Sequence, residues 1–153
     1  MRTFLVFTVE PFRLMVDAFR VHELLVRDAA GRIRGSGHMA WRGRLVPEVA
    51  LPALLGRTAD DPAAGGVDLI YGDDMSATLV MLRADRVIGL RRVEDAELRF
   101  LPPLVPGLAQ LFSGLILDPA DGKGILWLDA WPEVLLEMGR DLHRAVTGPR
   151  FLT

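Results

Sequence analysis

The sequence has no cysteine among its 153 residues, so it can form no disulfide, no thiolate metal site and no cysteine nucleophile. Asparagine is also missing, and a single lysine, Lys123, accompanies 17 arginines, an imbalance that we attribute to GC-rich coding. No apolar run approaches the roughly 18 residues that a membrane-spanning helix needs. The first apolar stretch, residues 4–9, is far too short for a signal sequence. We therefore expect a cytoplasmic protein without direct membrane insertion.

Strong net charge and a high aromatic content are absent as well. The formal charge is −2 and aromatic residues make up 7%, which argues against a nucleic-acid partner. Arginines 32, 34, 42 and 44 are close together in the sequence, but only Trp41 is near enough to stack on bases. We interpret this basic patch as a solvated surface unless it meets a protein. With half its residues apolar, the chain is long enough for one folded domain spanning 1–153.

The dominant pattern is one of short apolar or alternating segments separated by Gly- and Pro-containing turns, which is typical of β-strands. Glu10-Pro11 interrupts the first of them and predicts a tight hairpin. The same reasoning predicts strands at 4–9, 12–16, 21–27, 38–41, 44–49, 67–71, 76–82, 86–92, 96–101, 111–117 and 125–128. Many short strands with regular turns indicate a mainly β protein built from small barrels or a sandwich.

Two helices are predicted among these strands. Residues 51–56 have a proline in the first turn and a glycine at the end, which favours one short helix. Residues 132–146 form an amphipathic helix whose apolar face comprises Val134, Leu135, Met138, Leu142 and Val146. Residues 57–66, rich in Asp, Ala, Pro and Gly, are the expected boundary between two lobes.

The residues that usually perform chemistry are sparse and scattered. His22, His38 and His143 lie far apart, and none belongs to a paired metal-binding motif. Ser36 and Ser113 lack the glycine spacing of a nucleophile elbow. The sequence therefore predicts no catalytic residue, no metal site and no cofactor. A small hydrolase or ligand-binding barrel stays open as an alternative, and it would require His22 or His38 to meet an Asp or Ser.

One stretch of the chain carries a more specific signal. It consists of Trp41-Arg42-Gly43-Arg44-Leu45-Val46-Pro47-Glu48-Val49-Ala50-Leu51, followed by Leu54-Leu55-Gly56. This stretch resembles the signature of the CheW-like family, the adaptor module of bacterial chemotaxis. That signature is Asn-Leu-Arg-Gly, two or three apolar residues, Pro, then apolar-Asp-Leu and a short helix. Four further segments resemble the family in the right order: 4–16, Val21-His22-Glu23-Leu24, Ala84-Asp85-Arg86-Val87-Ile88-Gly89, and 114–138.

The resemblance implies a fold of two intertwined, SH3-like five-stranded β-barrels that share an apolar seam. It also implies a non-enzymatic adaptor, which binds the cytoplasmic tips of chemoreceptors and the regulatory domain of a histidine kinase. The residues that it assigns to the receptor-binding groove are Val21, Glu23, Leu24, Arg42 and Gly43. Trp41 joins these candidates because tryptophan and arginine are common at binding hot spots.

Several readings of these residues remain open from the sequence. Val21 and Leu24 are either groove or core residues, and Arg42 either meets a partner or pairs with an acid of its own lobe. Trp41 is either an exposed anchor or a core residue, and Gly43 permits a sharp bend. The chain has Ala40-Trp41 where the family has Asn-Leu, and its segment between Glu23 and Arg42 is shorter. These departures favour, as an alternative, a divergent module that serves another kinase pathway, such as surface motility or gene control.

Overall fold

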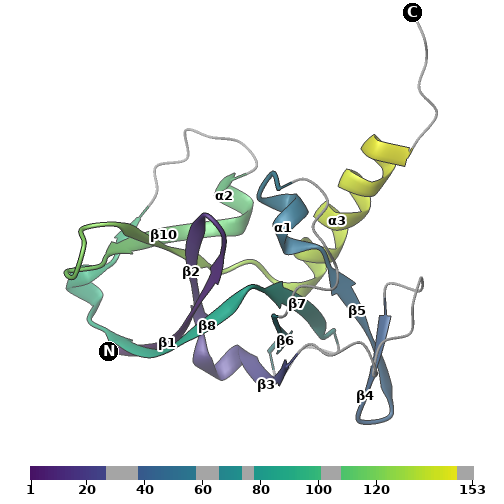
Figure 1. Cartoon of the computed structure of the whole chain (residues 1–153), viewed down its shortest axis with the longest axis horizontal. Helices are drawn as coiled ribbons and strands as arrows, with labels where there is room; N and C mark the ends of the chain where they lie inside the picture. The colour runs from purple at the N-terminus through teal and green to yellow at the C-terminus, as the bar shows by residue number, and fades with distance from the viewer. Residues whose placement is uncertain (27–37, 58–65, 74–77, 101–107, 148–153) are drawn as a thin grey trace, which may run out of the picture.

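The computed structural model describes residues 1–26, 38–57, 66–73, 78–100 and 108–147 (Figure 1). Strands β1 (Arg2–Val9) and β2 (Phe12–Asp17) form the predicted first hairpin, with a cis peptide bond between Glu10 and Pro11 at its turn. The prediction that residues 4–9 are buried on both faces is confirmed. Because side chains alternate along a strand, Phe4 and Val6 enter one core, whereas Leu5, Phe7 and Val9 enter another.

The first sheet has the strand order β8-β1-β2-β11-β10-β9. Its remaining strands are β8 (Arg86–Val93), β9 (Arg99–Phe100), β10 (Phe112–Leu117) and β11 (Gly124–Leu128). All neighbours are antiparallel except β2 and β11. This sheet encloses a core of Phe4, Val6, Met15, Val93, Ile116, Ile125 and Trp127.

The second sheet has the strand order β3-β6-β7-β5-β4. Its strands are β3 (Val21–Val26), β4 (His38–Trp41), β5 (Arg44–Val49), β6 (Val67–Tyr71) and β7 (Val80–Ala84). They enclose a smaller core of Val46, Ile70, Leu79 and Met81. The predicted mainly β fold of two sheets is confirmed. The first sheet has six strands rather than five, because the two residues of β9 join its edge.

The two sheets are interleaved along the chain. The chain leaves the first sheet after β2, builds the whole second sheet, and returns to the first with β8. The strands on both sides of residues 57–66, β5 and β6, therefore belong to the same sheet. Residues 58–65 themselves lie outside the described residues. The chain crosses between the sheets at the short 3-10 helix Ala18–Arg20 and between β7 and β8.

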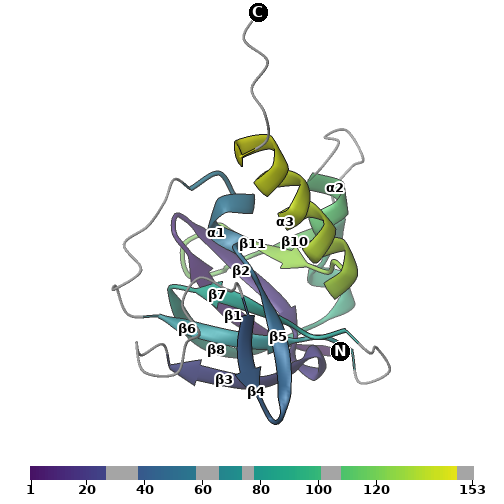
Figure 2. The same cartoon turned by 90° about the vertical axis from the view of Figure 1, so that its right-hand side faces the viewer.

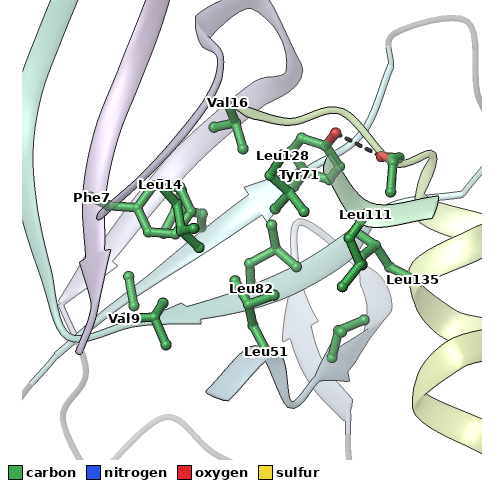
Figure 3. Close-up of a cluster of buried hydrophobic side chains, with 14 of the residues drawn as sticks. Phe7, Val9, Leu14, Val16, Leu51, Tyr71, Leu82, Leu111, Leu128 and Leu135 are labelled. Carbon is green, nitrogen blue, oxygen red and sulfur yellow. Dashed lines mark hydrogen bonds between the residues drawn. The ribbon is translucent and has the colours of Figure 1, made fainter. Parts of the chain in front are cut away.

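A third and larger core lies between the sheets (Figure 3). It combines side chains of the first sheet, such as Phe7 and Leu14, with side chains of the second, such as Leu69 and Leu82. Tyr71 of β6 lies within it, and its hydroxyl donates a 2.8 Å hydrogen bond to the carbonyl of Ala130, after β11. This core is the apolar seam that the sequence resemblance implies.

Three α-helices cover the seam at one side: α1 (Leu51–Leu54), α2 (Leu108–Leu111) and α3 (Pro132–Thr147) (Figure 2). The amphipathic helix predicted for 132–146 is thus confirmed as α3. Leu135 is fully buried in the seam, and Val134, Leu136 and Met138 pack against it. The described helices include none with the length and apolar character needed to cross a membrane.

The strand predicted at 96–101 is wrong for most of its length. Asp95–Glu97 form a 3-10 helix, only Arg99–Phe100 are extended, and residue 101 lies outside the described residues. The cause is a capping box. The side chain of Glu97 accepts a hydrogen bond from the backbone N–H of Glu94, and the side chain of Glu94 accepts one from the backbone N–H of Glu97. Capping stabilises a helical turn where the sequence alternation favours a strand.

Candidate partner-binding site

The candidate site is built around β3, whose register contains an irregularity. Val21 pairs with Tyr71 and Glu23 pairs with Ile70, so His22 is an extra residue in the ladder. Its ring Nε2 lies 2.8 Å from the carbonyl oxygen of Gly72. Because opposite residues of paired strands share a face, the bulge places Glu23 on the side of the second sheet's own core.

Trp41 is the last residue of β4, and its side chain reaches Glu23 of β3, the other end strand of the second sheet. Its indole Nε1–H donates a hydrogen bond to the carboxylate of Glu23. The ring of His22 approaches the indole edge-on, with centroids 6.3 Å apart. Trp41 is half-buried and packs against the second sheet's core, together with Leu25 and Met39. Trp41 is therefore a partly exposed residue whose polar edge has a partner inside the protein.

Arg42 and Gly43 form the two-residue turn between β4 and β5, since Trp41 pairs directly with Arg44. Both have positive φ angles, 45° for Arg42 and 75° for Gly43. Two positive φ angles match the right-handed twist of a hairpin, and glycine adopts them without cost. This turn is the sharp bend predicted at Gly43, and it extends away from the sheets in Figure 1.

The turn places the guanidinium of Arg42 over the indole of Trp41, with Cζ 4.8 Å from the ring centroid. Such a cation–π contact orients the guanidinium while leaving it in solvent. Arg42 is exposed, and among the described residues it forms no ion pair. The sequence left open whether Arg42 meets a partner or pairs with an acid of its own lobe. The described part of the chain offers no acid that pairs with Arg42.

The structure brings three of the six predicted residues into direct contact: Glu23, Trp41 and Arg42. Gly43 shapes the turn beside them. Val21 and Leu24 lie on the opposite face of β3, where their partners Tyr71 and Leu69 belong to the seam. Val21 packs against that seam, whereas Leu24 remains 43% exposed.

The sequence reasoning left out two further residues of β3 and β5. His22 was considered only as a metal ligand or base, although its ring contacts Trp41. Leu45, two positions after the turn in β5, is 64% exposed. The alternation of β5 could have indicated that Leu45 faces solvent, because Val46 beside it is buried. No local signal connects His22 to Trp41, since they are 19 positions apart.

Two of the residues considered for catalysis, His22 and Ser113, form structural contacts. His22 makes a hydrogen bond with the backbone carbonyl of Gly72. Ser113 donates a 2.9 Å hydrogen bond directly to Asp129, whose other carboxylate oxygen pairs with Arg20 at 3.0 Å. Within the described ranges, no three His, Cys, Asp or Glu side chains gather as they would around a metal ion.

Comparison with known proteins identifies the family. The CheW-like domain model matches residues 3–134, which is most of the chain. The chain belongs to the CheW-like domain family. A similar solved structure is the scaffolding protein TtCheW from Thermoanaerobacter tengcongensis, with a TM-score of 0.70 over 85% of this chain and 90% of that one. At 18% identity, this likeness concerns the fold. No curated protein sequence matches the chain.

Proposed function

We propose that this CheW-like protein is a non-enzymatic cytoplasmic adaptor that couples chemoreceptor tips to the regulatory domain of a histidine kinase. The observation that carries the proposal is the Glu23–Trp41–Arg42 cluster, because it presents an oriented guanidinium at the position where the family signature has its arginine. Membership of the family supports the adaptor class. The specific partners are our inference.

The chemistry of the surface fits the apolar face of a helical hairpin. Leu45 is an exposed apolar side chain on β5, and Arg42 supplies a forked donor at the turn that precedes this strand. An amphipathic helix binds through its apolar side chains, while a guanidinium at the rim binds a carboxylate or a backbone carbonyl. Val21, Glu23, Trp41 and Gly43 would contribute by holding this surface in shape. The kinase domain would bind elsewhere, at an exposed barrel end.

A second candidate is a divergent module in another kinase pathway, such as surface motility or gene control. The observation that favours it is that Trp41 engages the carboxylate of Glu23, so this charge is held inside the protein. The genes beside this one distinguish the two candidates. Receptor and chemotaxis-kinase genes support the first, and motility or regulatory genes without receptors support the second.

The direct test measures binding of the purified protein to a receptor-tip hairpin and to a kinase regulatory domain from the same genome. We expect Arg42→Glu to weaken receptor binding by about 1–3 kcal/mol, or roughly 5- to 150-fold, and to leave kinase binding unchanged. The matched control is Arg140→Glu on α3, which makes the same charge change at another exposed position. The thermal melt of Arg42→Glu should stay cooperative.

Three results would count against the proposal. Equal receptor affinity of the wild type and Arg42→Glu would remove Arg42 from the interface. Loss of the cooperative melt in Arg42→Glu, but not in Arg140→Glu, would make Arg42 a structural residue. Binding of the kinase domain alone would support the divergent module.

A further inference from the structure

The second sheet is open along one line. Strands β3 and β4 are its two end strands, and in the described residues each pairs with only one neighbour, β6 and β5 respectively. A barrel is closed only when its end strands are held together, because an end strand otherwise presents unpaired backbone N–H and C=O groups. Within the described residues, backbone pairing between β3 and β4 does not supply that closure.

Side chains close this line instead. Trp41 of β4 donates its indole hydrogen bond to Glu23 of β3, and His22 packs edge-on against the same ring. Met39 of β4 and Leu25 of β3 both pack on the core beneath. A tryptophan is suited to this position because its ring covers apolar area while its N–H satisfies a polar partner.

The same indole also holds the second charged group of the candidate site. Arg42 lies on its ring face, whereas Glu23 accepts from its edge. One rigid ring therefore separates a carboxylate that is engaged inside the protein from a guanidinium that is exposed. Of the two charges, the one available to a partner is that of Arg42.

We propose that Trp41 is a positioning residue that joins β3 to β4 and thereby fixes Arg42 for a partner that presents a carboxylate beside apolar side chains. For its partner, this inference rests on the proposed function. In this proposal Trp41 does not touch the partner itself. Glu23 affects partner binding only by holding the indole of Trp41, which in turn positions Arg42.

The test uses four variants of the full chain. Trp41→Phe keeps a ring beneath Arg42 but removes the N–H donor, and Glu23→Leu removes the acceptor. Glu23→Gln keeps an acceptor oxygen without the charge, and the double variant Trp41→Phe/Glu23→Leu removes both groups. Trp131→Phe, at an exposed tryptophan before α3, is the control.

The first readout is hydrogen exchange of the Trp41 indole N–H, followed by NMR. We expect exchange at least about tenfold faster in Glu23→Leu than in the wild type, with Glu23→Gln close to the wild type. We also expect Trp41→Phe and Glu23→Leu to lower the melting temperature by similar amounts. The double variant should be no less stable than either single variant, because both changes remove one shared interaction.

The second readout is affinity for the receptor-tip hairpin. It should fall by about tenfold in both Trp41→Phe and Glu23→Leu, and Glu23→Gln should recover most of it. A fall in Trp41→Phe without one in Glu23→Leu would make Trp41 a direct contact and overturn the proposal. An equal fall in Glu23→Gln and Glu23→Leu would overturn it too, because the charge of Glu23 would then be the partner contact.

Unchanged indole exchange in Glu23→Leu would show that Glu23 does not hold Trp41, and the inference would fail. If the wild-type protein binds no receptor tip, the proposed function fails by itself. The exchange rates still decide the matter in that case: faster exchange in Glu23→Leu supports the closure by Trp41, and unchanged exchange refutes it.

Discussion

At the scale of single residues, Tyr71 offers a clear probe, because it is the only tyrosine of the chain. Its ring is fully buried between the sheets, and burial raises the pKa of its hydroxyl above the ordinary value of 10.0. The hydrogen bond from Arg20, at 3.3 Å, opposes this increase only in part. Ultraviolet absorbance of the native protein should therefore show tyrosine ionising above pH 10.

The raised pKa of Tyr71 also predicts how stability depends on pH. The folded state keeps the hydroxyl proton at pH values where the unfolded chain has lost it. The contribution of Tyr71 is therefore complete below pH 10.0 and is lost as the pH rises through the folded pKa. Tyr71→Phe should be about 1 kcal/mol less stable at neutral pH, because Ala130 and Arg20 lose a partner.

Melting temperatures across the alkaline range check this prediction. The difference between the wild type and Tyr71→Phe should shrink as the pH rises above 10.0, because only the wild type has the titrating hydroxyl. Melting curves that shift in parallel with pH would contradict it.

The candidate site shows where residue-level inference from the sequence ends. Glu23 and Arg42 could be proposed from a resemblance, but the position of Trp41 between them could not. A hydrogen bond between residues 18 positions apart depends on how the two end strands of the sheet meet. Local patterns carry no such information, which is why the sequence left Trp41 open between an exposed anchor and a core residue.

At the scale of elements, α3 is attached to the rest of the molecule through one face. Leu135 is fully buried in the seam, whereas Glu137 on the other face is exposed. Leu135→Ala should cost about 2–5 kcal/mol, because it leaves a cavity in a packed core. Glu137→Ala, the matched control on the same helix, should change stability by less than about 0.5 kcal/mol. Urea unfolding of both variants measures the difference.

Truncation after Asp129 is the larger version of the same change. It removes α3 and also Ala130, whose carbonyl accepts the Tyr71 hydrogen bond. The truncated chain should unfold at a lower temperature and a lower urea concentration than the wild type. If the truncated chain had the same melting temperature as the wild type, α3 would not stabilise the seam.

Elements were predictable from the sequence where one signal dominates. The burial of residues 4–9 in β1 and the amphipathic character of α3 were both predicted correctly. The segment 96–101 was misread because a capping box competes there with strand alternation. The alternation of apolar and polar residues cannot predict the hydrogen bonds by which Glu94 and Glu97 cap a helical turn.

At the scale of the whole molecule, the family resemblance supplied the two-sheet architecture, but composition does not give the path of the chain between the sheets. The Gly- and Pro-rich segment 57–66 looks like a boundary, yet β5 and β6 on either side of it join the same sheet. Composition identifies loops, but which sheet receives the next strand depends on long-range pairing. The actual crossings are short and have ordinary composition.

The interleaved chain and the shared seam predict cooperative unfolding. The seam is the largest of the three cores, and both sheets contribute to it. Neither sheet can unfold alone without exposing this apolar surface to water, which is unfavourable. We therefore expect the two sheets to unfold in a single transition.

Tryptophan fluorescence can follow each sheet separately. Trp127 lies in the core of the first sheet and Trp41 beside the core of the second. Trp41→Phe/Trp131→Phe retains only the first reporter, and Trp127→Phe/Trp131→Phe retains only the second. Within each variant, the fluorescence midpoint in urea should coincide with the midpoint from circular dichroism. That internal comparison is unaffected by the stability that each substitution removes. A Trp41 signal that changes before the circular dichroism would mean that the second sheet opens independently, and the seam would then not couple the two.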